Sequence, residues 1–364
     1  MNKVISNSEL SKLKVYSYRE LFNNTINNDT ILIFEPNSFH HECTPGYVKY
    51  FLNLGYNVDI LMYKVGIDSL ALLPEYNKIK IFIFSDLKQI LNNSNILASN
   101  IIKYNYILLQ TTTHYEYEVF KKLNVFKISN SFFVFHNLNF VDELNCSRYY
   151  NEDRIWTLAN FSKGLQINPH YFGKMKIKNK NEKTNFFLTS SEKRNYTNLI
   201  KSIEKLEKEN LNYQIIVIGR SRSLNKYLIP RNILYRFLFL YSVKYNKLYD
   251  AIKKSDYIII PLDPFSNYDK EYNKTKSSGS IQLAYGFLKP PLINQEYSDI
   301  YKLNNNNSFI YNNDNLFDVM KKAILLKNKE YKQLVINLEK CSREIFNFSL
   351  NNIKKAFNKT NSYI

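Results

Sequence analysis

Residues 30–62 read TILIFEPNSFHHECTPGYVKYFLNLGYNVDILM, and this stretch predicts the fold of the N-terminal half. Its apolar run Thr30–Phe34 is rich in β-branched and aromatic residues, which is typical of a buried parallel strand. Tyr47–Leu54 carries apolar residues at helical spacing before Gly55, and Asn57–Met62 is a second strand pattern. A strand, a helix and a strand within about thirty residues predict a βαβ unit, which joins two parallel strands of one sheet.

The same alternation of strands and helices continues along the chain, after a polar and helix-prone stretch over residues 1–29. It predicts two α/β domains with doubly wound parallel sheets. Further strands are expected at Lys80–Phe84, Tyr106–Gln110, Ser131–Phe135, Arg154–Leu158, Asn185–Leu188, Tyr213–Ile218, Phe237–Val243, Asp256–Asp263 and Leu292–Asn294. Further helices are expected at Asp86–Leu91, Tyr115–Leu123, Leu199–Leu206, Tyr245–Lys254, Leu316–Leu326, Glu330–Phe346 and Leu350–Phe357.

The length of 364 residues exceeds one ordinary core and also predicts two domains. We expect a Rossmann-like domain over residues 1–173, a linker over 174–184, a second Rossmann-like domain over 185–345 and a C-terminal helix or tail over 346–364. The linker is inferred from residues 174–183, KMKIKNKNEK, which are polar and charged and show no periodicity.

The net charge of +18 predicts an anionic partner or substrate, such as a nucleotide or a phospholipid surface. Lys residues diluted among Asn supply most of this charge, without the Arg clusters of RNA-binding modules, so nucleic acid is disfavoured. The chain has no run of 18 apolar residues and no signal-peptide pattern, so we expect a cytoplasmic protein that at most rests on the inner membrane face. Cys43, Cys146 and Cys341 lie far apart, which disfavours a disulfide framework or a zinc site.

Residues 274–291 read KTKSSGSIQLAYGFLKPP and follow the expected strand Asp256–Asp263. Ligands of open α/β sheets bind beyond the carboxyl ends of strands, and this stretch offers cations, hydroxyls and Gly279 to an anion. We expect Ser280 to cap a helix that begins near Ile281, whose N-terminus favours a phosphate. The stretch is interpreted as a phosphate or diphosphate cradle or as a basic surface loop, and its sequence alone does not separate the two.

A second anion-binding candidate follows the expected strand Asn185–Leu188, where residues 189–196 read TSSEKRNY. Lys193 and Arg194 lie close in sequence to three hydroxyl groups there. The alternative is a solvated, basic helix start, but cations in the first turn of a helix oppose its dipole. Because residues that break a local rule tend to lie at functional sites, the pattern favours anion binding.

Four of the five histidines fall in loops that follow expected strands: His40, His41, His114 and His136. A lone histidine beyond a strand usually caps a helix or bonds a backbone carbonyl, and we prefer this role for His114. The run His40-His41-Glu42 differs, because a histidine beside a carboxylate can act as a general base or orient a hydroxyl near neutral pH. His136 is intermediate between these two cases.

The order of these segments resembles the GT-B glycosyltransferases, especially bacterial enzymes similar to glycosyltransferase family 4, over about residues 31–345. The resemblance implies two Rossmann-like domains that face one another across a cleft, with the C-terminal helices packing back toward the N-terminal domain. The motifs that carry it are His40-x-Glu42-x-x-Pro45-Gly46, Val134-Phe135-His136-Asn137, Asn168-Pro169-x-Tyr171-Phe172-Gly173, Thr189–Tyr196, Tyr249–Leu262 and Lys276–Ser280 with the Lys289-Pro290 that follows.

By this likeness the protein is a metal-independent glycosyltransferase that moves a sugar from a nucleotide-diphosphate sugar to a glycan or glycolipid acceptor of the cell envelope. The nucleotide sugar is a co-substrate held by the second domain, and no cofactor or metal is implied, because basic side chains and a helix dipole take the place of a cation. The resemblance implies catalytic roles for His41, Glu42, His136, Lys193 and Lys276. It implies donor or phosphate binding by Thr189, Ser190, Arg194, Tyr196, Gly219, Ser242, Val243, Lys276, Ser277, Ser278, Gly279 and Ser280.

Two departures from the family pattern lie in the same region. Family 4 members usually carry two glutamates eight positions apart, and Thr275 and Leu283 occupy those positions here. The nearest acids are in the segment Asp263–Glu271 and can substitute only if the loop folds back. Leu288 stands where a glycine is usual before Lys-Pro.

Two alternatives to an active transferase remain, and the missing glutamates support the first of them. One is a catalytically degenerate GT-B module that binds a glycan or nucleotide without turnover. The other is a nucleotide-sugar epimerase of similar layout, which predicts no separate acceptor groove. The sequence predicts neither the donor nucleotide and sugar, nor the acceptor, the stereochemistry or the oligomeric state.

Overall fold

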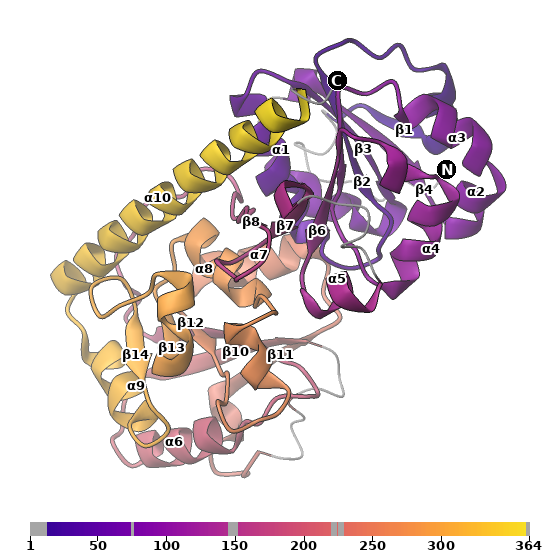
Figure 1. Ribbon diagram of the computed structural model, residues 1–364. Helices are drawn as coiled ribbons and strands as arrows, with labels where there is room; N and C mark the ends of the chain where they lie inside the picture. The colour runs from indigo at the N-terminus through magenta and orange to yellow at the C-terminus, as the bar shows by residue number, and fades with distance from the viewer. Residues whose placement is uncertain (1–12, 74–75, 145–151, 220–223, 225–228, 362–364) are drawn as a thin grey trace. The chain divides into compact units, whose positions relative to one another are not determined.

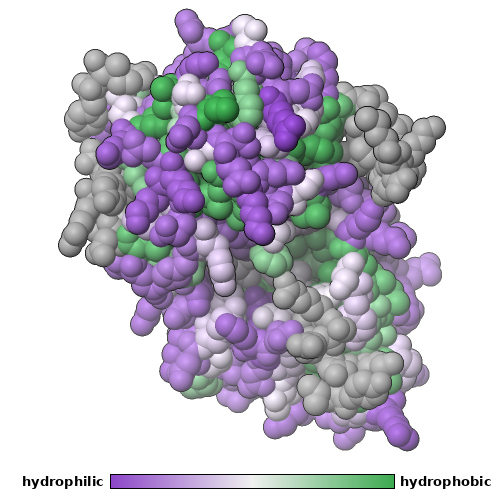
Figure 2. Space-filling view, turned by 90° about the vertical axis from the view of Figure 1, so that its right-hand side faces the viewer, coloured by the Kyte–Doolittle hydropathy of each residue, from purple (hydrophilic) through white to green (hydrophobic). Residues whose placement is uncertain are grey.

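A computed structural model describes residues 13–73, 76–144, 152–219, 224 and 229–361 of the chain (Figure 1). The chain divides into two compact units. Unit 1 comprises Met1–Gly173 and Phe346–Ile364, and unit 2 comprises Lys174–Ile345. Hydrophilic residues cover most of the face seen in Figure 2. No helix in the described ranges is long and apolar enough to cross a lipid bilayer.

Unit 1 contains one parallel sheet with the strand order β1-β4-β3-β2-β5-β6-β7-β8 (Figure 1). The chain order reverses direction between β2 and β5, so the carboxyl ends of these two strands flank a topological switch point. Ligands of open α/β sheets bind at such points. The strands are β1 Val15–Ser17, β2 Thr30–Glu35, β3 Asn57–Tyr63, β4 Ile79–Phe84, β5 Tyr106–Leu109, β6 Ser131–Phe135, β7 Ile155–Thr157 and β8 Leu165–Gln166.

Helices cover both faces of this sheet, because its strands are apolar on both sides. On one face Phe51 of α1 stacks on Phe357 near the end of the chain, with ring centroids 6.2 Å apart. On the other face Phe34 of β2 meets Phe120 of α4 at 6.0 Å. The α-helices are α1 Thr44–Asn53, α2 Leu87–Asn92, α3 Ser94–Ile101, α4 His114–Lys122 and α5 Asn139–Glu143. Short 3-10 helices are η2 Tyr18–Asn23, η3 His41–Cys43, η4 Lys64–Leu72, η5 Tyr76–Lys78, η6 Val125–Lys127 and η8 Glu152–Arg154.

Unit 2 repeats the plan with a parallel sheet in the order β11-β10-β9-β12-β13-β14. Its switch point lies between β9 and β12. The strands are β9 Thr184–Thr189, β10 Tyr213–Gly219, β11 Phe237–Tyr241, β12 Tyr257–Ile260, β13 Pro291–Asn294 and β14 Phe309–Tyr311. The helices are α6 Thr197–Glu207, α7 Tyr245–Lys254, α8 Gly279–Phe287, α9 Leu316–Leu325 and α10 Asn328–Asn361, with η10 Leu234–Arg236, η11 Asp269–Asn273, η12 Gln295–Tyr297 and η13 Asp299–Tyr301. The part of α10 from Phe346 onward belongs to unit 1.

The predicted α/β class with two doubly wound parallel sheets is confirmed. The residues of the expected linker, 174–183, have no regular structure and lie in unit 2, where the Asn181 backbone N–H donates to Asp256 at 2.9 Å. Near the other end of the chain, Ile353, Ala356 and Phe357 pack into the apolar core of unit 1. Phe357 lies 3.7 Å from the ring of Tyr106.

Three local predictions were wrong. Residues 1–12 of the stretch expected to be helix-prone lie outside the described residues, and its described part contains the strand β1, which pairs with β4 at the edge of the sheet, before the 3-10 helix η2. The stretch expected as a buried strand at Phe237–Val243 is the edge strand β11, where Leu238 is 42% exposed because β11 has a neighbour on one side only. The two helices expected at Glu330–Phe346 and Leu350–Phe357 form the single helix α10, because residues 347–349 contain neither proline nor glycine.

The two described cysteines, Cys43 and Cys341, are buried and form no disulfide bond. Cys146, the third cysteine of the chain, lies outside the described residues.

Candidate functional site

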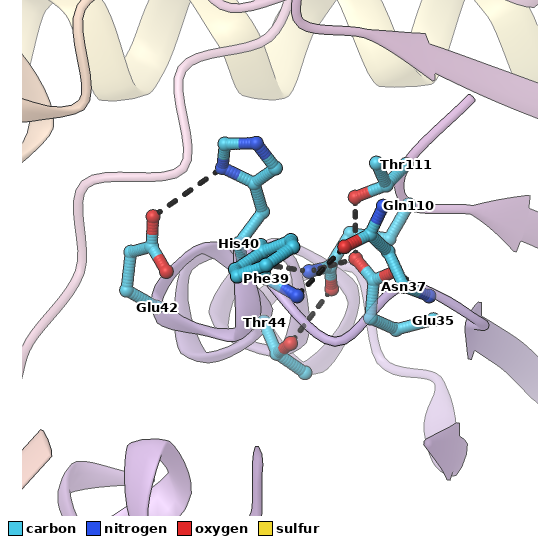
Figure 3. Close-up of polar contacts among 8 residues, drawn as sticks. All are labelled: Glu35, Asn37, Phe39, His40, Glu42, Thr44, Gln110 and Thr111. Atoms are coloured by element: carbon cyan, nitrogen blue, oxygen red, sulfur yellow. Dashed lines mark hydrogen bonds and ion pairs between the residues drawn. The ribbon is translucent and has the colours of Figure 1, made fainter. Parts of the chain in front are cut away.

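The switch point of unit 1 holds a buried carboxyl group. Glu35, the last residue of β2, is 0% exposed. Its Oε2 accepts hydrogen bonds from Gln110 Nε2 at 2.9 Å and from Thr111 Oγ1 at 2.6 Å, both just beyond β5 (Figure 3). Its Oε1 accepts from the backbone N–H of Asn37 at 2.8 Å. Burial raises the pKa of Glu35 well above its ordinary value, against the opposing effect of the Thr111 and Asn37 donors.

His40 lies next to this acid in an unusual backbone conformation. Its φ angle is +64°, in the left-handed region that non-glycine residues seldom adopt. Its carbonyl accepts from Gln110 Nε2 at 3.0 Å and from the Cys43 backbone N–H at 3.0 Å. The imidazole stacks on His136 with ring centroids 4.0 Å apart, and its Nδ1 lies 3.5 Å from Glu42 Oε1. His40 therefore connects the loop after β2 with the residue that follows β6.

His136 presents an unpaired nitrogen beside this stack. One ring nitrogen bonds the backbone of Gln110, while Nε2 is buried and has no hydrogen-bond partner among the described residues. Burial, together with the neighbouring His40, lowers the pKa of His136 well below its ordinary value. A neutral imidazole with one nitrogen held by the backbone keeps the other nitrogen as a proton acceptor.

His41, which was expected to be catalytic, lies inside unit 1. It is 1% exposed, and burial lowers its pKa to about 4. Its ring packs on Gly66 so closely that a Cβ atom at residue 66 would lie 2.4 Å from the imidazole. Neither ring nitrogen has a hydrogen-bond partner in the described part of the chain. A catalytic role for His41 stays a prediction, but the structure makes its neighbour His40 the more accessible imidazole.

His114 is the first residue of α4, and its Nε2 lies 2.7 Å from Glu143 Oε2. The cap of that helix is Thr113, whose side chain accepts from the backbone N–H of Tyr115. His114 therefore makes neither of the contacts that we preferred for it, a helix cap or a bond to a backbone carbonyl. An exposed pair of side chains is found in its place.

The switch point of unit 2 gathers three cationic side chains around two tyrosines. Lys193 Nζ and Lys276 Nζ lie 5.3 Å and 4.9 Å from the ring centroid of Tyr268. The Arg194 guanidinium lies 5.8 Å from the ring of Tyr272, whose hydroxyl donates to Tyr268 at 3.3 Å. The cations thus come from the loop after β9 and from the loop before α8, the two stretches that the sequence singled out for anion binding.

The loop before α8 also contains hydroxyl groups without partners. The Oγ atoms of Ser277 and Ser278 and the Oγ1 of Thr275 are buried and have no hydrogen-bond partner in the described ranges. Ser278 is 1% exposed and occupies the N-cap position of α8, yet its side chain caps no N–H group. The expectation that Ser280 is the cap was wrong: α8 begins two residues earlier than predicted, and Ser280 Oγ instead lies 2.6 Å from Thr189 Oγ1.

The acids near this loop have different environments. Glu271 forms an ion pair with Lys276, because the backbone N–H groups of residues 274–276 all bond the Glu271 carbonyl and fold the loop back. Asp269 is buried, accepts from the backbone N–H of Asp263 at 3.1 Å, and has its pKa raised by burial. Leu283, at the second of the usual glutamate positions, is 5% exposed and lies in the core.

A cavity of about 590 Å³ opens beyond the carboxyl ends of β9, β10 and β11. It brings together four predicted donor-site residues and Lys193, which was expected to be catalytic, while Tyr196 supports the loop from outside through a hydrogen bond of its hydroxyl with the Ser191 backbone N–H at 2.7 Å. A larger cavity of about 740 Å³ in the same unit is lined by none of the predicted site residues. The lining of the smaller cavity comprises Ser190, Ser191, Glu192, Lys193, Ile218, Gly219, Ser242, Val243 and Tyr268.

Comparison with models of known protein families finds no match, and comparison with curated proteins finds none either. Solved structures do match over most of the chain. A glycosyltransferase from Rickettsia africae has 17% sequence identity and a TM-score of 0.53, covering 92% of this chain and 99% of that chain. Anabaena HepE in complex with UDP and glucose has 14% identity and a TM-score of 0.58, covering 93% of this chain and 100% of that chain. This chain has the GT-B fold.

The GT-B fold supplies one switch point per unit, and both carry polar groups. Sequence reasoning found the cationic residues of unit 2 but missed Glu35 and Gln110 of unit 1. A signal was present for Glu35, because an acid that directly ends an apolar strand is placed where burial is expected. The contact between Gln110 and His40 joins residues 70 positions apart and left no local signal. Membership of glycosyltransferase family 4 stays a prediction.

Proposed function

We propose that the protein is a glycosyltransferase that moves a sugar from a nucleotide-diphosphate sugar to a glycan or glycolipid acceptor of the cell envelope. One observation carries the proposal: Lys193 and Lys276 share the ring of Tyr268, beside the unpaired hydroxyls of the loop that begins α8. A buried hydroxyl without a partner costs about 1–3 kcal/mol, so a loop with several such groups is suited to a ligand that satisfies them.

A diphosphate has the chemistry that these groups lack. Its oxygens accept hydrogen bonds from hydroxyls and from the free N–H groups at the start of α8, and its charge is balanced by ammonium and guanidinium groups. Lys276 is paired with Glu271 in the ligand-free protein, so we expect the diphosphate to take the place of that carboxylate. The structure of HepE with UDP and glucose, which shares this fold, supports a uridine nucleotide as the first candidate.

The reaction that we propose moves one glycosyl group. The acceptor hydroxyl oxygen bonds the anomeric carbon, the bond from that carbon to the diphosphate oxygen breaks, and the diphosphate leaves with the electron pair. Lys193, Arg194 and Lys276 stabilise the negative charge that builds on the leaving group, and we propose that they do so without a metal ion. The proton of the acceptor hydroxyl passes to a base, for which His40 with Glu42, or Nε2 of His136, has the required lone pair.

The acceptor class and the location are part of the same proposal. A net charge of +18 favours contact with an anionic membrane surface, where lipid-linked glycans are assembled. We therefore propose a cytoplasmic protein that acts at the inner membrane face. The residues of unit 1 proposed for the acceptor side are His40, Glu42 and His136, with His41 behind them.

A thermal-shift panel of UDP, GDP, ADP and CMP, with and without an attached sugar, tests the nucleotide site. A ligand that binds only the folded chain raises the melting temperature, and we expect one nucleoside diphosphate series to do so. Lys276→Ala should abolish the shift. Lys274→Ala, which removes an exposed cation from the same loop, is the matched control and should keep it. If no nucleotide shifts the melting temperature, the transferase proposal fails.

One observation favours a second candidate, a GT-B module that binds a nucleotide sugar without turnover. Thr275 and Leu283 place no carboxylate at the two positions where family 4 members usually carry glutamates, and Leu283 is buried. This candidate predicts a thermal shift with one nucleotide sugar but no release of free nucleotide in the presence of any glycan acceptor. Release of nucleotide that depends on an acceptor would exclude it.

A further inference from the structure

Glu35 is the most deeply buried acid among the described residues of unit 1, and its side chain has no surface exposed to solvent. Its carboxyl group takes three hydrogen bonds, and one of these leads toward the imidazole pair. Gln110 donates that bond and uses the same amide nitrogen to donate to the carbonyl of His40. The amide nitrogen of Gln110 thereby donates one hydrogen bond to Glu35 and one to His40, and Figure 3 marks hydrogen bonds among these residues by dashed lines.

The orientation of the Gln110 amide is set from both ends. Its nitrogen faces the acceptors of Glu35 and His40, and its Oε1 accepts from Thr44 Oγ1 at 2.7 Å. A reversed amide would put its NH₂ against the Thr44 hydroxyl and its oxygen against two acceptors. Glu35 and Thr44 therefore decide which end of Gln110 reaches His40.

His40 depends on this contact because its backbone is strained. A left-handed φ costs a non-glycine residue about 1–2 kcal/mol, and it persists only where neighbouring groups hold it. The carbonyl of His40 has one such bond from Cys43 within its own turn and one from Gln110 across the switch point. The backbone of Gln110 also bonds the ring of His136, so both stacked imidazoles are held by one residue.

We infer that Glu35 is a positioning residue that acts through Gln110 to keep the His40 ring stacked on His136 beside Glu42. This inference deepens the proposed function, on which it rests for its catalytic consequence. Glu35 Oε2 accepts from both Gln110 Nε2 and Thr111 Oγ1, which an amide nitrogen in the same place cannot do.

Glu35→Gln is the decisive variant, because it keeps the size of the carboxyl group and replaces one of its two accepting oxygens with an NH₂ group. That NH₂ group faces either the Thr111 and Gln110 donors or the Asn37 backbone N–H. Glu116→Gln is the matched control: Glu116 is a second buried acid in this region, it bonds Asn37 and Thr113, and no bond joins it to Gln110. The measurement is the NMR signal of the His40 ring, identified by its loss in His40→Asn, since stacking on His136 displaces that signal. We expect Glu35→Gln to move the signal toward that of an exposed histidine and Glu116→Gln to leave it in place.

The double variant Glu35→Gln/Gln110→Glu supplies the rescue. It exchanges the acid and the amide, so the carboxyl group introduced at position 110 accepts from the new amide and donates to the His40 carbonyl. We expect it to restore most of the His40 signal displacement. In a transfer assay Glu35→Gln should lower kcat about 10-fold with the donor KM unchanged, because a misplaced base affects the chemical step.

The inference is overturned if Glu35→Gln leaves the His40 signal in place, if Glu116→Gln moves it as far, or if the double variant fails to restore it. Should Glu35→Gln not fold, Gln110→Met cuts the same link from its other end and makes the same prediction for the signal. The NMR measurement needs no substrate. A failure to find any transferred sugar would therefore count against the proposed function and leave this test intact.

Discussion

The two switch points of the chain occupy equivalent places in two similar sheets, yet they carry opposite kinds of chemistry. The one in unit 1, between β2 and β5, holds a buried acid whose pKa is raised by burial, together with the imidazoles of His41 and His136, whose pKa values are lowered by burial. The one in unit 2, between β9 and β12, holds fixed cations and hydroxyls without partners. Neutral titratable groups are suited to moving protons, and fixed cations are suited to holding an anion.

The difference also concerns how complete each site is without a ligand. The carboxyl of Glu35 accepts hydrogen bonds from three donors of its own unit, so its hydrogen bonding is complete in the folded chain without a ligand. Ser277 and Ser278 have buried oxygens with no partner in the described residues, so their hydrogen bonding is complete only when a ligand binds. The comparison teaches that the hydrogen bonds of Glu35 serve to position residues, whereas the loop before α8 is suited to binding a ligand.

Glu35→Ala should have the largest effect of the changes considered, and it tests whether the unit 1 site is complete. It leaves three buried donors unpaired, at about 1–3 kcal/mol each, so we expect the free energy of unfolding to fall by about 4 kcal/mol. Lys276→Ala in unit 2 should change the ligand-free stability by less than about 1 kcal/mol, because it removes a partly exposed ion pair. Urea denaturation of both variants without ligand checks the pair. Equal losses in the free energy of unfolding of the two variants would contradict the proposed difference between the two switch points.

The pH dependence of stability should report on His41. Burial lowers its pKa from 6.5 to about 4, so between these values the unfolded chain binds a proton that the folded chain does not. The free energy of unfolding should therefore fall as the pH falls from 6.5 to 4, by about 3 kcal/mol in all, and should not depend on His41 above that range. His136, whose pKa is also lowered, acts in the same direction. In His41→Phe the fall should be smaller by that amount, and an unchanged pH profile would contradict the prediction.

The sequence predicted the general plan of both sites because the strands, and the loops that follow them along the chain, can be recognised from local patterns. The apolar runs that became β2 and β9 are read from a few neighbouring residues, and polar stretches directly follow them. Lys193 and Lys276 were identified in this way before any contact was known. Their common contact with Tyr268 was not, because it depends on how a loop of many residues folds back.

Backbone conformation explains what the sequence could not decide. The left-handed φ of His40 turns His41 into the core and His40 outward. The accessible imidazole is therefore that of His40 and not that of His41, which was expected to be catalytic. Leu288, at the position where a glycine is usual, has a φ of +54° at the end of α8, which is the conformation that glycine adopts most easily. Its side chain packs against the core of unit 2, and this contact offsets part of the strain.

Tyr268→Leu should weaken nucleotide binding without disturbing unit 1. The ring of Tyr268 holds two ammonium groups at 5.3 Å and 4.9 Å, and each such contact contributes about 1 kcal/mol. We expect the Kd for UDP, measured by calorimetry, to rise about 10-fold. Tyr268→Phe keeps the ring and loses only the hydroxyl, so it should bind nearly as well as the wild type. Equal losses in the two variants would show that the hydroxyl, and not the ring, arranges the cations.

The smallest expected effect comes from removing one hydroxyl at each switch point and comparing the two changes in stability. Thr111→Val removes a paired hydroxyl and should lower the free energy of unfolding by about 1 kcal/mol, whereas Ser278→Ala removes an unpaired one and should leave it unchanged or slightly higher. With UDP present the order should reverse, because Ser278→Ala loses a group that the ligand satisfies. Thermal unfolding of both variants, with and without UDP, measures the reversal. If Ser278→Ala destabilises the ligand-free protein as much as Thr111→Val does, the Ser278 hydroxyl has a partner already, and unit 2 is as complete without ligand as unit 1.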